Sequence, residues 1–182
     1  MTQEHPLHRH IGAFLEGLTL PHDCKLLLAP ECGGSHNLPL FCSDQKSNDT
    51  EYCNVDALVV TAGSIRFILE IEESGFSPTK VCGKFLTSAL STHFIHDILG
   101  GTATAMHAEV TFVQVMDASK LPLRTKKVEQ GAALEHSIQR ILPLLGTGIK
   151  QYRLFFFHGV QNFMDDHAKR ADLEATFTRA CS

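Results

Sequence analysis

Tryptophan is absent from this 182-residue chain, tyrosine occurs only twice, and no long apolar run is present. No segment reaches the roughly 18 consecutive apolar residues that a membrane-spanning helix needs. The first six residues lack the basic region and apolar core of a secretory leader, so we expect a cytoplasmic protein without a membrane partner. The 16 basic and 20 acidic residues give a net charge of −4, which excludes nucleic-acid binding through overall positive charge.

Two common kinds of site are also missing. The six cysteines include no C-x-x-C pair, and the spacings of Cys24, Cys32, Cys42 and Cys53 do not match a zinc site, so we expect free thiols. The glycine pair at residues 100–101 lacks the Lys-Ser or Lys-Thr that completes a phosphate-binding loop. A structural zinc site and a glycine-rich phosphate loop are therefore not expected.

The composition that remains is that of a folded protein, with 43% hydrophobic and 20% charged residues in a length that suits one domain over residues 1–182. Hydrophobic periodicity predicts both helices and strands, and hence an α/β fold. We expect helices at residues 8–18, 77–91, 128–142 and 162–179, and strands at 25–29, 55–60, 65–72, 109–116 and 152–157. A short strand near residues 38–42 is expected within a polar loop over 33–52, and residues 100–106 are expected to form a loop.

Acidic side chains gather in the strand expected at residues 65–72. Because side chains alternate along a strand, Glu70 and Glu72 share one face with Arg66. Two carboxylates on one face of so apolar a strand repel each other and lose hydration, unless a cation or hydrogen-bond donors compensate them. Glu73 breaks the alternation and is expected to lie in solvent at the strand end.

The preceding strand adds a third carboxylate, Asp56. A three-residue hairpin loop over residues 61–63 would place Asp56 opposite Ile68 and diagonal to Glu70, on the same face. A loop one residue longer or shorter would turn Asp56 to the opposite face. In the expected register, Asp56, Glu70 and Glu72 form a set of hard oxygen ligands that suits Mg²⁺ or Mn²⁺.

These acids form a spaced motif, which reads Val55-Asp56, then thirteen residues, then Glu70-Ile71-Glu72. The motif and the expected element order resemble the PD-(D/E)XK nuclease superfamily, which contains the restriction-endonuclease-like enzymes. The resemblance implies an αβββαβ core over about residues 8–116, with a mixed central sheet flanked by helices, and a C-terminal α-β-α extension over about 117–182. It also implies a Mg²⁺-dependent endonuclease that cuts DNA, with Asp56, Glu70 and the backbone carbonyl of Ile71 as metal ligands.

Two positions depart from the superfamily's pattern, because Val55 replaces its proline and Glu72 replaces its usual lysine. The resemblance assigns Glu72 to the attacking water, as in members that carry Glu-x-Glu. It assigns the lysine's role to Lys80 or Lys84, which lie one turn apart on the following helix. The basic side chains of the loop over residues 119–127 are candidates for contact with DNA phosphates. They are Lys120, Arg124, Lys126 and Lys127.

Three functions remain open for this pattern. The first is the active nuclease, for which cutting both strands of a duplex favours a homodimer. The second is a module of the same fold that has lost catalysis and keeps a nucleic-acid-binding or structural role, which the net negative charge and the missing lysine at position 72 favour. The third is a hydrolase with paired carboxylates, such as a glycosidase. The absence of tryptophan and the presence of only two tyrosines make a cleft that stacks on a sugar less expected.

Overall fold

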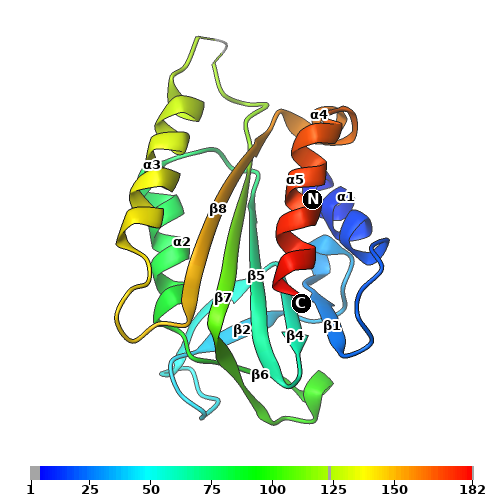
Figure 1. Ribbon diagram of the computed structural model, residues 1–182, viewed down its shortest axis with the longest axis vertical. Coiled ribbons are helices and arrows are strands. Elements are labelled where there is room, and N and C mark those ends of the chain that lie inside the picture. Colours follow the sequence, from blue (N-terminus) through cyan, green and yellow to red (C-terminus); the bar gives the residue numbers. More distant parts are fainter. Residues whose placement is uncertain (1–4, 123, 182) are drawn as a thin grey trace.

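An open, mixed β-sheet flanked by helices organises the chain in the computed structural model, which describes residues 5–122 and 124–181 (Figure 1). The first four residues, on which the expectation about a secretory leader partly rests, lie outside this range. The strands of the described part are β1 (Cys24–Leu28), β2 (Leu38–Phe41), β3 (Glu51–Val55), β4 (Ala57–Thr61), β5 (Ser64–Glu72), β6 (His93–Ile95), β7 (Ala103–Asp117) and β8 (Ile149–Phe157). The α-helices are α1 (Pro6–Glu16), α2 (Pro78–Leu90), α3 (Lys127–Ile141), α4 (Gly159–Asp165) and α5 (His167–Ala180), and the 3-10 helices are η1 (Pro30–Cys32) and η2 (Asp97–Leu99).

The strands follow the order β1-β4-β5-β7-β6-β2-β3, and β8 pairs with β7. β1, β4 and β5 are antiparallel neighbours, whereas β5, β7 and β8 run parallel. The long strand β7 pairs with β6 through its first residues and with β5 and β8 further on. β6, β2 and β3 form an antiparallel arm on this part of β7. β5 therefore lies between two partners and presents both of its faces to helices.

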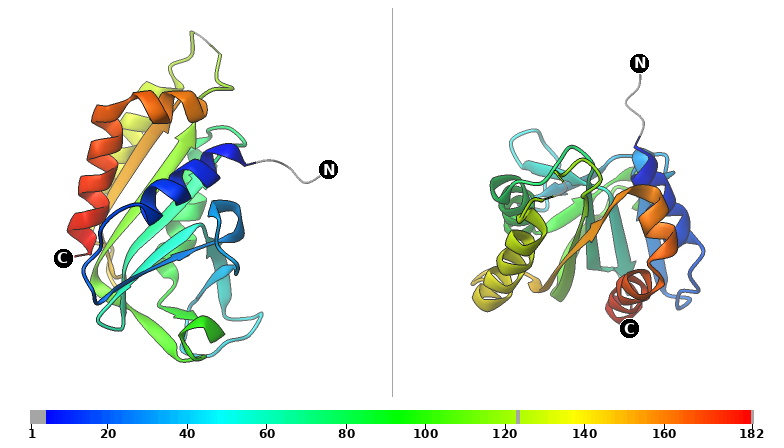
Figure 2. Two further views of the ribbon diagram at one scale, coloured as in Figure 1. Left: turned by 90° about the vertical axis from the view of Figure 1, so that its right-hand side faces the viewer. Right: turned by 90° about the horizontal axis from the view of Figure 1, so that it is seen from above.

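Helices cover both faces of the sheet (Figure 2). α2 and α3 pack on one face, and α1, α4 and α5 pack on the other. Along β5, Ile68 belongs to the α2–α3 layer, while Phe67 and Leu69 belong to the α1–α5 layer. Continuing this alternation, Glu70 and Glu72 face α2.

The start of α2 is fixed by its own residues. Pro78 occupies the first turn, and the hydroxyl oxygen of Ser77 accepts a hydrogen bond from the backbone N–H of Lys80 at 3.2 Å. Val81 and Phe85 are buried against the sheet. This anchoring determines which side chains of α2 reach β5.

The C-terminal region differs from the expected α-β-α extension. β8 pairs along β7 and so completes the main sheet, and the single helix expected over 162–179 is divided into α4 and α5. The division falls at Asp166, whose carboxylate caps α5 by accepting from the backbone N–H of Lys169 at 3.0 Å. Residues 103–106, expected in a loop, belong to β7. None of the helices that the structure describes is both long and apolar enough to span a bilayer.

Candidate functional site

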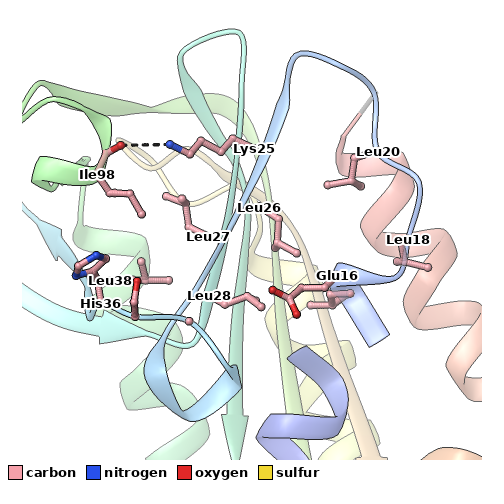
Figure 3. A pocket seen from close by; sticks show the side chains of 13 residues that line it. Glu16, Leu18, Leu20, Lys25, Leu26, Leu27, Leu28, His36, Leu38 and Ile98 are labelled. Carbon is pink, nitrogen blue, oxygen red and sulfur yellow. Dashed lines mark hydrogen bonds between the residues drawn. The ribbon is translucent and has the colours of Figure 1, made fainter. Parts of the chain in front are cut away.

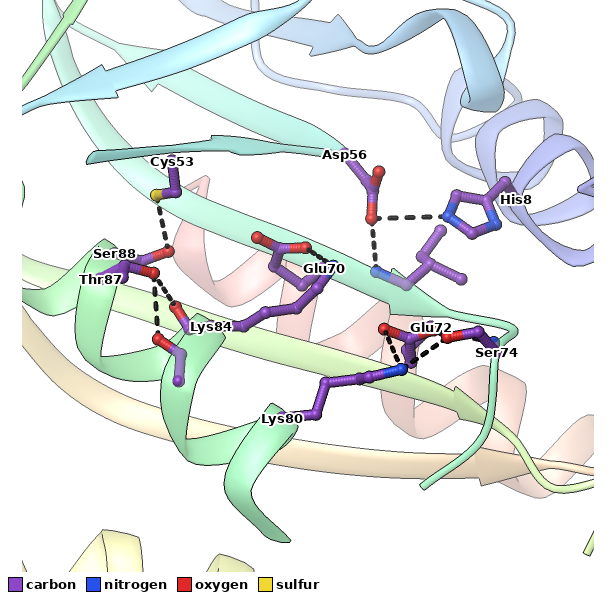
Figure 4. A network of polar contacts seen from close by, with 12 residues as sticks. His8, Cys53, Asp56, Glu70, Glu72, Ser74, Lys80, Lys84, Thr87 and Ser88 are labelled. Carbon is purple, nitrogen blue, oxygen red and sulfur yellow. Dashed lines mark hydrogen bonds and ion pairs between the residues drawn. The ribbon is translucent and has the colours of Figure 1, made fainter. Parts of the chain in front are cut away.

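Each of the two glutamates on the α2 face of β5 is met by a lysine from α2 (Figure 4). Lys84 Nζ lies 2.5 Å from Glu70 Oε2, and Lys80 Nζ lies 3.5 Å from Glu72 Oε2. The geometry follows from the two backbone repeats. Four residues of a helix rise about 6 Å, and two residues of a strand rise about 6.6 Å. A lysine pair at i and i+4 therefore faces a glutamate pair at i and i+2.

Glu70 is the most enclosed member of the site, with 2% of its surface exposed. Burial raises the pKa of Glu70, the ammonium of Lys84 lowers it, and the charge of Asp56 raises it again, so that the pKa lies above its ordinary value. Burial lowers the pKa of Lys84, but the charge and hydrogen bond of Glu70, together with the charges of Asp56 and Glu72, raise it above its ordinary value. The site thus holds a carboxylate that is costly to ionise without a cation close by.

Glu72 has a different environment at the end of β5. Its Oε1 accepts hydrogen bonds from the backbone N–H of Ser74, at 2.7 Å, and from the Ser74 hydroxyl. Lys80 donates to the same hydroxyl oxygen at 2.5 Å. Burial raises the pKa of Glu72, but the bonds from Ser74 and the charges of Lys84 and Lys80 lower it overall. Glu72 is therefore a charged carboxylate held by the loop that follows β5.

The hairpin between β4 and β5 differs from the expected one. Its loop has two residues, Ala62 and Gly63, with φ angles of 48° and 75°, as a tight hairpin turn requires. Alone, this shorter loop would turn Asp56 away from the α2 face. A bulge at Arg66, between the pairs that join β5 to β4, adds one residue and restores the alternation.

Asp56 consequently lies beside Glu70, in the bend between β3 and β4. The backbone N–H of Asp56 donates to the carbonyl oxygen of Leu69 at 3.0 Å. Its carboxylate Oδ2 accepts from the backbone N–H of Ile71 at 2.6 Å. The structure therefore holds Asp56 on the backbone of Leu69 and Ile71, beside Glu70. Among the described residues, however, Asp56, Glu70 and Glu72 do not form a group of ligand atoms within 4.8 Å of one another. That Asp56, Glu70 and Ile71 bind a metal stays a prediction.

His8, a buried residue of α1, joins the site without having been expected there from the sequence. Its Nε2 lies 3.6 Å from Asp56 Oδ2, and its Nδ1 lies 2.7 Å from Glu73 Oε1. Burial lowers the pKa of His8, but Asp56 and Glu73 raise it by more. Glu73 was expected in solvent but is buried, because its carboxylate contacts the ring of His8 instead of water. The burial of His8 could have been predicted from the helical pattern, which places His8 on the apolar face of the helix with Ile11.

The basic residues of the loop before α3 divide into two pairs. Lys120 Nζ donates to the carbonyl oxygen of Glu73, and Lys127 Nζ to that of Phe76, each at 3.2 Å. These two lysines attach their loop to the segment between β5 and α2. Arg124 and Lys126 are exposed to solvent.

A cavity of about 350 Å³ lies elsewhere, between α1, β1 and the loop after η1 (Figure 3). Leucines of β1 line it, and its ionisable side chains are Glu16, Lys25 and His36. Lys25 Nζ donates to the carbonyl oxygen of Ile98 at 3.2 Å. None of Asp56, Glu70, Glu72, Lys80 and Lys84 lines this cavity. It is therefore separate from the carboxylate–lysine site.

The site thus combines side chains from β5, α2, α1 and the bend before β4. Comparisons of the chain with protein-family models, with curated proteins and with solved structures found no significant match. What the site can do must therefore be argued from its geometry and chemistry.

Proposed function

We propose that the protein is a metal-dependent nuclease that hydrolyses phosphodiester bonds in DNA at the C-terminal end of β5. The observation that carries the proposal is the ion pair between the buried Glu70 and Lys84, with the Asp56 carboxylate held on the backbone N–H of Ile71, next to Glu70 in the strand. Two carboxylates from neighbouring segments supply oxygen ligands, and an ammonium beside them supplies a positive charge. Phosphodiester hydrolysis needs both, because negative charge builds up on the phosphate in the transition state.

The residues present fit a hard divalent cation. The Glu70 side chain is 3% exposed and has Asp56 as a second acidic neighbour, so a cation stabilises its charged form. Mg²⁺ or Mn²⁺ would be held by Asp56, Glu70 and the backbone carbonyl of Ile71, with water and phosphate oxygens as further ligands. Such an ion supplies charge neutralisation on the phosphate and lowers the pKa of a bound water.

The remaining residues have separate roles in this proposal. Glu72 is ionised, so it accepts a hydrogen bond or a proton from the attacking water. Lys84 places its charge beside the scissile phosphate, while Lys80 holds Glu72 through a direct ion pair and through Ser74. Lys120, Arg124, Lys126 and Lys127 contact the DNA backbone at the edge of the site.

The arrangement of elements supports the same proposal. In chain order, α1, β1, β4, β5, α2 and β7 follow the αβββαβ pattern of a restriction-endonuclease-like core, and their four strands are successive neighbours in the sheet. β2 and β3 are insertions before β4, and β6 is an insertion before β7. A homodimer would supply the second active site that a double-strand cut requires.

A catalytically inactive module is the second candidate, and a specific observation favours it. Lys84 and Lys80 already neutralise Glu70 and Glu72, so the network is internally compensated. In such a module, the lysines and carboxylates stabilise the contact between α2 and β5, and DNA binds without being cut.

A nicking assay separates these candidates. Supercoiled plasmid is incubated with the protein and Mg²⁺ or Mn²⁺, and the wild type is compared with Glu70→Gln and Lys84→Met. A matched control is Glu174→Gln, which changes an exposed carboxylate on α5. The proposal expects nicking by the wild type and the control, and a loss of at least about a hundredfold in both site variants. Equal activity in all four proteins would contradict the assignment, and no activity in any would favour the inactive module.

A further inference from the structure

A second cluster of ligand-type side chains lies where the start of α1 meets the end of β5. His5, His8 and Glu73 each offer one ligand atom, and these atoms all lie within 4.8 Å of one another. Over residues 5–122 and 124–181, this is the one group of three histidine, cysteine or acidic side chains that comes so close together. The histidines are three residues apart, which places them on one side of the first helical turn.

Packing and hydrogen bonds hold this cluster in place. His8 and Glu73 are 6% and 7% exposed. Glu73 Oε1 accepts from the backbone N–H of His8 at 3.0 Å and lies 2.7 Å from the ring Nδ1 of the same residue. The rings of His5 and His8 meet edge to face, with centroids 5.0 Å apart. Because these side chains are already fixed, binding an ion there costs little conformational entropy.

One ring nitrogen of His5 lacks a partner within the described part of the chain. His5 Nδ1 is buried and has no hydrogen-bond partner among the described residues. A buried ring nitrogen without a partner is unfavourable, unless a group other than the described residues binds to it. A metal ion in the cluster would be such a group.

The far side of His8 carries a further feature of metal sites. Its Nε2 lies 3.6 Å from Asp56 Oδ2, on the opposite side of the ring from Glu73. A carboxylate behind a ligating histidine orients the ring and fixes which nitrogen carries the proton. Asp56 is placed to do this for His8 when Nδ1 faces the metal.

We infer that His5, His8 and Glu73 form a binding site for a divalent cation of the Zn²⁺ class, which ties the start of α1 to the end of β5. Two imidazoles and one carboxylate are typical Zn²⁺ ligands that leave one position open, whereas Mg²⁺ prefers oxygen ligands alone. Tetrahedral Zn²⁺ with bonds of about 2.0–2.1 Å places its ligand atoms about 3.3 Å apart. The contact of 2.7 Å between His8 and Glu73 would open only slightly to admit the ion. This inference does not depend on the proposed nuclease activity.

Titration with Co²⁺, a coloured substitute for Zn²⁺, tests the site without reference to catalysis. Metal-stripped protein without a histidine tag is titrated with Co²⁺, and the visible absorption of the bound ion is followed. We expect one equivalent to bind to the wild type, Zn²⁺ to displace it, and Mg²⁺ at the same concentration to leave it in place. His5→Gln and Glu73→Gln should each weaken binding at least about tenfold. His10→Gln, on an exposed position of the same helix, should bind like the wild type.

The outcome is decisive in either direction. If the wild type shows no visible Co²⁺ absorption, or if His5→Gln binds Co²⁺ as tightly as the wild type does, the inference is wrong. Glu70→Gln distinguishes this site from the proposed active site. It should keep the Co²⁺ absorption while it loses DNA nicking. Failure of nicking alone would leave the histidine site standing, and failure of Co²⁺ binding alone would leave the nuclease proposal standing.

Discussion

Replacing Lys84 with methionine should destabilise the protein, and the loss should grow as the pH rises. The substitution keeps a side chain of similar length but removes the ammonium that lies 2.5 Å from Glu70. The Glu70 side chain is 3% exposed, so water cannot take the place of the ammonium. Breaking a buried ion pair typically costs about 3–5 kcal/mol. Because the Lys84 side chain is 33% exposed, we expect the low end of this range at pH 8.

The sign of the pH dependence follows from Glu70. Its pKa is raised by burial in the folded protein, so folded Glu70 keeps its proton at pH values where the unfolded chain has lost it. A neutral Glu70 does not need the ammonium. We therefore expect the loss of unfolding free energy in Lys84→Met to fall to about 1 kcal/mol at pH 5, which is the typical contribution of one hydrogen bond. For one carboxyl group, the change cannot exceed about 1.4 kcal/mol for each pH unit.

Urea unfolding followed by circular dichroism at pH 5 and pH 8 measures both values. The double variant Lys84→Met/Glu70→Gln should recover most of the stability lost at pH 8, because the uncompensated charge is gone. Lys80→Met is the matched control and should cost less than about 1 kcal/mol, since Glu72 keeps its bonds from Ser74. An equal loss at both pH values, or a double variant as unstable as the single one, would refute the reasoning.

Three further predictions concern the elements around the site. Burial lowers the pKa of His8 but its two carboxylate partners raise it by more. In metal-free protein, NMR should therefore show the His8 imidazole titrating above 6.5, and Glu73→Gln should lower its pKa. The contribution of His8 to the free energy of unfolding should be present below pH 6.5 and be lost as the pH rises through the pKa of the folded state. Gly12→Ala would place a Cβ 1.9 Å from a carbonyl oxygen of η1, so urea unfolding should show a loss of about 1–3 kcal/mol. A Cβ at Gly83 would meet no atom within 4 Å, so Gly83→Ala should stabilise α2 by about 1 kcal/mol. Deleting Arg66 removes the extra residue of the bulge but leaves Val60 paired with Ile65 and Val59 paired with Phe67, so the following side chains of β5 keep their faces and circular dichroism should still show one cooperative unfolding transition.

The elements near the site follow closely from the sequence, because strong local signals determine them. The strand expected at residues 65–72 is β5, and the helix expected at 77–91 is α2, whose start is marked by Ser77 and Pro78. β3 and the first residues of β7 escaped prediction because they are short or half-exposed and lack a clean alternation of apolar and polar side chains. Their pairing depends on partners that are distant in the sequence.

The candidate residues of the carboxylate–lysine site could be named from the sequence, but the partners of each side chain could not. The spacing of Lys80 and Lys84 predicts that both lie on one face of a helix, which α2 confirms, yet only the packing of α2 on β5 assigns each lysine to its own glutamate. His8 shows the opposite case. Its place on the apolar face of α1 is readable, but its carboxylate partners come from 48 and 65 residues further along, and no local pattern connects them.

For Asp56, the predicted face of the sheet is correct although the predicted register between β4 and β5 is not. The face of a strand residue depends on the combined number of loop and bulge residues between it and its partner. A three-residue loop without a bulge and a two-residue loop with a bulge at Arg66 leave Asp56 on the same side of the sheet. They differ by two residues in pairing, because the shorter loop and the bulge each shift β5 by one residue and together move Asp56 from the position opposite Ile68 to the position beside Glu70. Arg66 carries no sequence signature of a bulge. The position of Asp56 beside Glu70 therefore became visible only in three dimensions, as did the burial that is the largest cause of the raised pKa of Glu70.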